Sequence, residues 1–192
     1  MNGEKKQNIA IRSAKEISFI AVFVALVTAA QLLLAAIPNV EIVSVLFIAY
    51  AYAFGVKRGL AAATAFSLLR QLIFGFFPSV LCLYLLYYNL LVTVFAFLAK
   101  LVKKPLSGLV WIVVTACVCA VFFTLTDNIL TPLWYAYSPS AAKAYFVASM
   151  PFLLTHVISV GVSVALLFLP LERVFRLVKK LLESKEYHKK SK

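Results

Sequence analysis

The chain has 192 residues, of which 64% are hydrophobic and only 14% are charged. An ordinary soluble domain carries about 25% charged residues, and the mean hydropathy here is +0.97. These values exclude a soluble globular domain, a disordered chain and a disulfide-rich secreted module. The net charge of +12 would suggest nucleic-acid binding in a soluble protein, but the positions of the charges give a different explanation.

The apolar residues fall into six stretches, and each predicts a transmembrane helix. A membrane-spanning helix needs about 20 apolar residues, and Pro, Gly or basic residues separate the stretches. The predicted spans are 17–37, 42–54, 60–77, 80–99, 109–130 and 146–169. The second is short, and we expect it to extend a few residues into its flanks. The sequence thus predicts an all-α membrane protein with no room for a separate nucleotide-binding domain.

The lysine and arginine residues predict the orientation of the bundle. Of the 19, 17 lie in the two tails and in the loops after the second and fourth spans. The opposite loops hold only Lys143, and Arg70 lies inside the third span. Because basic residues favour the cytoplasmic side, we expect both termini in the cytoplasm, that is, an N-in/C-in bundle of six transmembrane helices. The positive charge then reflects topology, and we expect no nucleic-acid partner.

The predicted division of the chain is a cytoplasmic tail (1–16), a six-helix transmembrane domain (17–170) and a basic cytoplasmic tail (171–192). Residues 138–144 are small and polar, and are interpreted as an external loop. In residues 171–182, apolar side chains recur at helical spacing among basic ones. This pattern is typical of an amphipathic helix on the inner membrane surface. The alternative is the cytoplasmic end of the sixth span.

Polar side chains inside the predicted spans gather in the outer half of the bilayer. Such groups are costly in lipid and usually face a cavity or the bundle interior. The inner half carries little beyond Ser and Thr, whereas a continuous pore needs polar lining at both depths. We therefore expect a pocket that opens outward and is closed toward the cytoplasm. The candidate ligand-binding residues are Glu41, Arg70, Gln71, Tyr84, Tyr88, Asn89, Asp127 and His156.

These residue types suggest particular roles. Arg70 can hold an anionic group through its guanidinium fork. Asp127 or Glu41 can hold a cationic group, or can pair with Arg70. Tyr84 and Tyr88 share a helix face by their spacing and can stack on a planar ring or simply pack.

Other residues of the set have structural alternatives. Asn89 can be a polar contact between helices, and His156 a satisfied core histidine. A catalytic hypothesis uses His156 as a base for Ser159 or Ser163, which share its helix face, but no orienting group or protease motif is evident. The cysteines lie inside spans as apolar filler, without metal-ligand spacing. We therefore expect no enzyme, no metal site and no cofactor.

The first span carries Ala21, Ala25 and Ala29 on one helix face. Such a face lets another helix approach closely, either within the protein or from a partner. This stripe, the six-span layout with both ends inside, the chain size and the lack of an ATPase domain resemble the S component of an energy-coupling factor (ECF) transporter. Segments that also resemble bacterial S components are residues 37–43, residues 54–59, and Gly75-Phe76 followed by Tyr84 and Asn89.

The resemblance implies a substrate-binding subunit in a bacterial plasma membrane that captures a vitamin or related micronutrient from outside. Its partners would be the ECF T transmembrane subunit, docked on the alanine stripe, and two cytoplasmic ATPase subunits. In the mechanism proposed for the family, the subunit topples in the membrane and opens its pocket inward. An alternative is a solitary small-molecule transporter acting as a homo-oligomer through the same stripe. The charge of the ligand is open, because acidic and basic side chains both belong to the predicted pocket.

Overall fold

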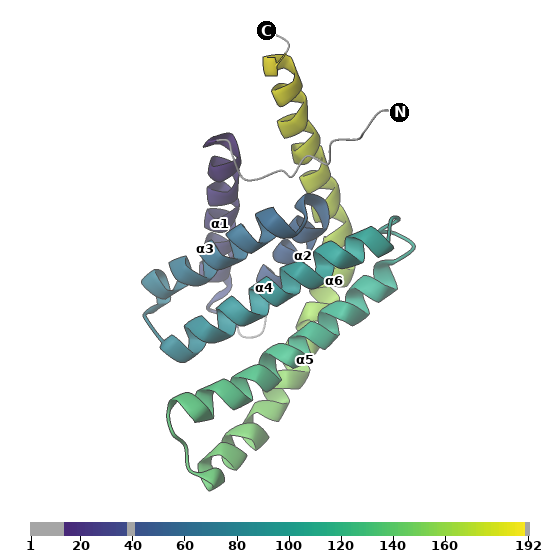
Figure 1. Ribbon diagram of the computed structural model, residues 1–192. Coiled ribbons are helices and arrows are strands. Elements are labelled where there is room, and N and C mark those ends of the chain that lie inside the picture. Colours follow the sequence, from purple (N-terminus) through teal and green to yellow (C-terminus); the bar gives the residue numbers. More distant parts are fainter. Residues whose placement is uncertain (1–13, 38–40, 191–192) are drawn as a thin grey trace, which may run out of the picture.

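The protein is all-helical in a computed structural model that describes residues 14–37 and 41–190. Six helices and no strand lie within these residues (Figure 1), which confirms the all-α part of the predicted fold class. Most of the predicted N-terminal tail and the Pro38-Asn39 turn lie outside the described residues. The helices are α1 (Ala14–Leu34), α2 (Val43–Phe54), α3 (Val56–Phe74), α4 (Pro78–Leu101), α5 (Leu109–Trp134) and α6 (Pro139–Lys190).

Four of these helices, α1, α4, α5 and α6, are long and apolar enough to cross a membrane. Large apolar side chains cover much of their outer surface: Val22, Leu101 and Leu166, for example, are 66%, 81% and 70% exposed. In water such a surface would be an aggregation hazard, whereas in lipid it is the expected exterior. The described chain is therefore compatible with a multi-pass membrane protein.

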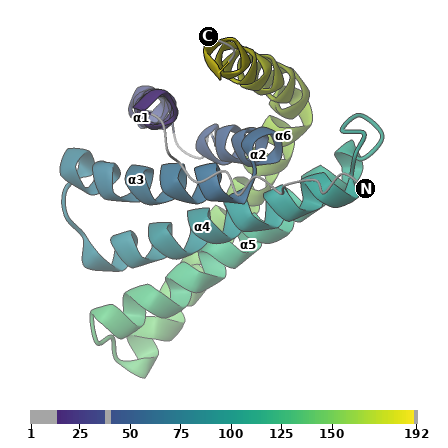
Figure 2. The same ribbon diagram turned by 45° about the horizontal axis from the view of Figure 1, so that its top comes forward.

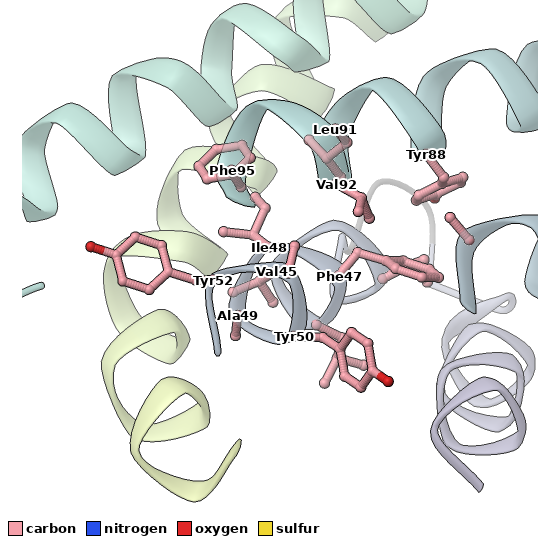
Figure 3. Close-up of a cluster of buried hydrophobic side chains, with 14 of the residues drawn as sticks. Val45, Phe47, Ile48, Ala49, Tyr50, Tyr52, Tyr88, Leu91, Val92 and Phe95 are labelled. Atoms are coloured by element: carbon pink, nitrogen blue, oxygen red, sulfur yellow. The ribbon is translucent and has the colours of Figure 1, made fainter. Parts of the chain in front are cut away.

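Helix α2 lies at the centre of the molecule, between α1, α4 and α6 (Figures 2 and 3). All 12 of its residues are buried. At 1.5 Å per residue the helix is about 18 Å long, which is shorter than the hydrocarbon core of about 30 Å. Phe47 and Tyr50 carry much of its packing, because Phe47 contacts the ring of Tyr88 on α4 and Tyr50 stacks on Phe23 of α1 at 3.9 Å.

A glycine sets the end of α2, which does not extend into its flanks as expected. Gly55 has φ +82° and ψ −177°, a backbone conformation that L side chains rarely adopt. The chain therefore turns at this residue, and α3 begins directly at Val56. This tight connection leaves α2 as a short buried helix.

Helices α5 and α6 run side by side (Figures 1 and 2) and continue through proline residues that were expected to end them. Pro132, expected to close the fifth span, lies inside α5, and Pro170, expected to close the sixth, lies inside α6. Pro151, within the predicted sixth span, also lies inside α6. Residues 139–144, expected to be an external loop, form the first turns of α6. In lipid, an unpaired backbone group has no water to bond, so a bent helix is less costly than a broken one.

The segment after Pro170 continues α6 and packs on the bundle. Its Phe175 is 7% exposed and contacts the rings of Phe23 and Tyr50 at 5.7 Å each. The Nζ atom of Lys179 donates a hydrogen bond to the carbonyl oxygen of Ala53 at 2.9 Å. The apolar side of this segment around Phe175 therefore faces the protein, as expected for the end of the sixth span.

Further contacts join the helix ends that we predict to be cytoplasmic. Arg58, at the start of α3, pairs with Glu16, at the start of α1. The hydroxyl of Tyr52, near the end of α2, donates to the carbonyl oxygen of Val102, just after α4. These ends thus lie together, and the opposite ends of the same helices carry the candidate ligand-binding residues.

Candidate ligand-binding site

Glu41 lies immediately before α2 and links it to α6. Its carboxylate Oε2 accepts the N–H of Ser44 at 3.2 Å, one of the N–H groups that the first turn of a helix leaves without an internal partner. The positive end of the helix dipole favours an anion at this position. The N–H of Glu41 itself donates to Ser159 Oγ on α6 at 2.9 Å. Glu41 is therefore held at two points: its carboxylate by the first turn of α2, and its own N–H by Ser159 of α6.

His156 faces Glu41 from α6. Its Nε2 lies 3.7 Å from Glu41 Oε1, and its ring contacts Phe123 and Phe152 at centroid distances of 5.4 and 5.9 Å. The side chain is buried, and its Nδ1 has no hydrogen-bond partner. Among the described residues no hydrogen bond joins His156 to Ser159, whose hydroxyl accepts from Glu41 instead. The geometry therefore does not provide a serine activated by this histidine.

Arg70 and Tyr84 form a second polar contact, between α3 and α4. The guanidinium lies over the ring of Tyr84 at 4.3 Å and over that of Phe74 at 5.1 Å. Gln31 reaches the same tyrosine from α1, with its Nε2 donating to the hydroxyl oxygen at 3.2 Å. Three helices thus meet at Tyr84. The predicted pairing of Arg70 with Asp127 or Glu41 is not formed, since neither pair is among the ion pairs of the described residues.

The guanidinium of Arg70 is only partly satisfied. Its Nε and Nη1 atoms are buried and have no hydrogen-bond partner. A buried donor without a partner costs about 1–3 kcal/mol, and more when it is charged. A cation–π contact returns about 0.5–2 kcal/mol, so the two rings do not offset two unpaired charged donors. Arg70 therefore retains two buried donors that no described residue accepts.

The other predicted residues of α3 and α4 differ in their surroundings. Gln71 is 4% exposed, accepts the N–H of Phe77 through Oε1 at 3.1 Å, and leaves its Nε2 unpaired. Asn89 donates to the carbonyl oxygen of Leu85 in its own helix at 2.7 Å and accepts from Thr64 of α3 at 3.3 Å. Asn89 therefore joins two helices, in agreement with its structural alternative.

Tyr88 packs in the hydrophobic core, as Figure 3 shows. It is 2% exposed and contacts the rings of Phe47 and Phe66 at 5.0 and 5.2 Å. Tyr84 is 5.2 Å from it, and one face of Tyr84 is covered by Arg70. These ring contacts are the ones that the packing alternative for Tyr88 predicts.

Asp127 lines a cavity of about 330 Å³ between α5 and α6. Its Oδ1 accepts from Thr131 at 2.8 Å, and its Oδ2 accepts from Tyr145 at 2.6 Å. Phe123 and Phe152, which contact His156, also line this cavity. Two aromatic rings therefore separate the cavity from the His156–Glu41 pair. The cavity is lined by Phe123, Thr124, Asp127, Tyr145, Ala148, Ser149 and Phe152.

Several of these residues were missed in the sequence. Tyr145 lies just before the predicted start of the sixth span, so its distance from Asp127 could not be inferred. Ser149 accepts a hydrogen bond from Asn128 Nδ2 at 2.7 Å, but a serine in an apolar helix gives no distinctive signal. Phe123 and Phe152 look like ordinary lipid-facing or core residues. If the sixth helix were predicted to begin at Pro139, Tyr145 would be expected to lie next to α5.

The alanine stripe lies on the outside of α1. Ala21, Ala25 and Ala29 are all exposed, next to the exposed Val22 and Leu26. Internal packing against a neighbouring span, one of the two interpretations of the stripe, is therefore wrong. The small side chains leave a smooth helix surface available to lipid or to another protein.

The described chain is thus all-helical and compatible with a multi-pass membrane protein, and it buries polar side chains between its helices. No group of three His, Cys, Asp or Glu side chains within the described ranges is placed to hold a metal ion. No family model matches the chain, and neither the curated proteins nor the solved structures contain a match.

Proposed function

We propose that the chain is the substrate-binding membrane subunit of an ECF-type importer, which captures a vitamin or related micronutrient outside a bacterial cell. The observation that carries the proposal is the set of polar atoms buried without partners at one end of the bundle. They are Gln31 Oε1, Arg70 Nε and Nη1, Gln71 Nε2 and His156 Nδ1, which are five of the seven such atoms in the described residues; the other two are the Tyr50 hydroxyl oxygen and Asn128 Oδ1. Buried polar groups are normally paired, so this concentration favours a site that binds a solute.

The proposed orientation is N-in/C-in with six membrane-embedded helices. It rests on the basic residues, which lie in the tails and at the ends joined by the Arg58–Glu16 and Lys179–Ala53 contacts. The polar site then opens outward. Release into the cell requires a rearrangement, and in this proposal partner ATPase subunits supply its energy.

The exposed alanine face supports a partner inside the membrane. Helices in lipid associate through close backbone approach, which small residues permit. Ala21, Ala25 and Ala29 provide such a face on α1, and in this proposal it docks on the T subunit, which joins two cytoplasmic ATPase subunits. A homo-oligomeric transporter would use the same face for self-association.

The proposal is tested by purification of the tagged protein from its native membrane in a mild detergent, with partners identified by mass spectrometry. We expect a T-type membrane subunit and two ATPases with the wild type, and at least a tenfold loss of both in an Ala21→Leu/Ala25→Leu variant. Bulky side chains at these positions would separate the helix backbones. The matched control is Ala65→Leu/Ala165→Leu, because these alanines are exposed on other helices.

The control should retain the partners at the wild-type level. If the wild type is recovered alone, or only with copies of itself, the importer-subunit proposal fails and the homo-oligomeric transporter replaces it.

A further inference from the structure

The acidic side chains of the candidate site already have partners within the protein. Glu41 Oε2 accepts the N–H of Ser44 at 3.2 Å, and its Oε1 is 3.7 Å from His156 Nε2. Asp127 accepts hydroxyl donors at both oxygens, from Thr131 at 2.8 Å and Tyr145 at 2.6 Å. Each carboxylate thus has internal partners that offset part of the cost of its burial, so neither requires a cationic ligand to be satisfied.

The basic side chain of the site, that of Arg70, differs from the carboxylates because it has no charged partner in the described residues. Arg70 belongs to none of the ion pairs found in the described part of the chain. Its described partners are the faces of two aromatic rings and the hydroxyl of Tyr84, and its Nε and Nη1 atoms remain without a hydrogen-bond partner. The adjacent Gln71 is 4% exposed and also retains an unpaired donor, Nε2. The unpaired charge of the site is therefore positive.

We propose that the ligand of this site is a small organic anion, and that its carboxylate binds the Arg70 guanidinium beside Tyr84. Charge-assisted hydrogen bonds from arginine to a carboxylate are strong and directional. Charges inside the bundle are weakly screened, so the attraction between the guanidinium and the carboxylate is stronger there than in water. Gln31 and Tyr84, joined at 3.2 Å, hold the edge of this position from α1 and α4. The inference rests on the proposed solute-binding function and specifies the class of solute.

The test uses three fragments that share one ring and differ in charge: sodium benzoate, benzamide and benzylamine. Each is added to the purified full chain in detergent at constant ionic strength, and the thermal unfolding temperature Tm is measured. At about tenfold its Kd, a ligand raises Tm by about 3–6 °C in a protein of this size. We expect this shift for benzoate and at most a third of it for the neutral and cationic fragments.

The variants assign the shift to Arg70. In Arg70→Gln the benzoate shift should disappear, whereas Arg70→Lys should keep part of it because the charge remains. The matched control is Arg173→Gln, which removes a positive charge from an exposed position on α6, toward the end that we predict to be cytoplasmic. This variant should keep the full benzoate shift. The comparison of Tm shifts for the three fragments uses the wild-type protein, so it still tests the inference if a variant does not fold.

The outcomes separate this inference from the proposed function. If benzamide or benzylamine stabilises the wild type as well as benzoate does, the site binds a solute but the anion inference is wrong. A benzoate shift that persists unchanged in Arg70→Gln also overturns it. If none of the fragments stabilises the protein, both the anion inference and the solute-binding role of this site fail.

Discussion

At the residue scale, the main feature of this protein is the difference between paired and unpaired polar groups. The carboxylates of Glu41 and Asp127 have internal partners, whereas Arg70, Gln71 and His156 retain buried atoms without one. Groups with partners stabilise the fold, and buried groups without them destabilise it; in the proposed function a ligand supplies the missing partners. The two kinds of residue should therefore respond differently to substitution.

The substitution Tyr145→Phe tests a polar group that has an internal partner. It removes the hydroxyl that donates to Asp127 Oδ2 at 2.6 Å, a bond to a charged group that contributes about 1.5–3 kcal/mol. We expect the free energy of unfolding to fall by about this amount, with a decrease of several degrees in Tm in detergent. Tyr137→Phe is the control, since Tyr137 is 40% exposed. Equal Tm values for the two variants would show that the Asp127 contact does not stabilise the fold.

At the element scale, the apolar stretches predicted most of the helices. The six helices overlap the six predicted stretches, because hydrophobicity is a local property of the sequence, and four of them are long and apolar enough to cross a membrane. The helix ends were less predictable. Pro132 and Pro170 do not end their helices, since the membrane makes a broken helix costly.

The contacts of the candidate residues could not be predicted from the sequence. The sequence placed Arg70, Asp127 and Glu41 at one end of the bundle, but it left their pairing open. Tyr145 became the partner of Asp127 only because α6 begins at Pro139. Tyr88 lies in the hydrophobic core because rings from α2 and α3 surround it. Such contacts depend on the rotation of each helix, which sequence spacing alone does not give.

The connection between α2 and α3 gives a prediction at this scale. A Cβ atom at Gly55 would meet nothing within 4 Å, yet the residue has φ +82°. The cost of Gly55→Ala should therefore come from the backbone alone, at about 1–3 kcal/mol, and should appear as a lower Tm. An unchanged Tm would mean that α2 and α3 can be joined by another backbone conformation.

At the scale of the whole molecule, the two ends of the bundle differ in chemistry. One end gathers basic residues and is joined by the Arg58–Glu16 and Lys179–Ala53 contacts. The other holds the unpaired polar atoms around Arg70 and His156. The proposed importer needs the first end in the cytoplasm and the second outside, so the orientation of the chain decides whether the site can capture a solute from the medium.

Single cysteines at the two ends test this orientation in intact cells. In a background with Cys82, Cys117 and Cys119 replaced by alanine, Ala141→Cys lies exposed in the first turns of α6, and Ser107→Cys lies exposed between α4 and α5. Because basic residues favour the cytoplasmic side, a membrane-impermeant maleimide should label Ala141→Cys directly. It should label Ser107→Cys only after the membrane is permeabilised. The reverse pattern would place Arg70 on the cytoplasmic side, where it could not receive a solute from outside, and capture from the medium would be excluded.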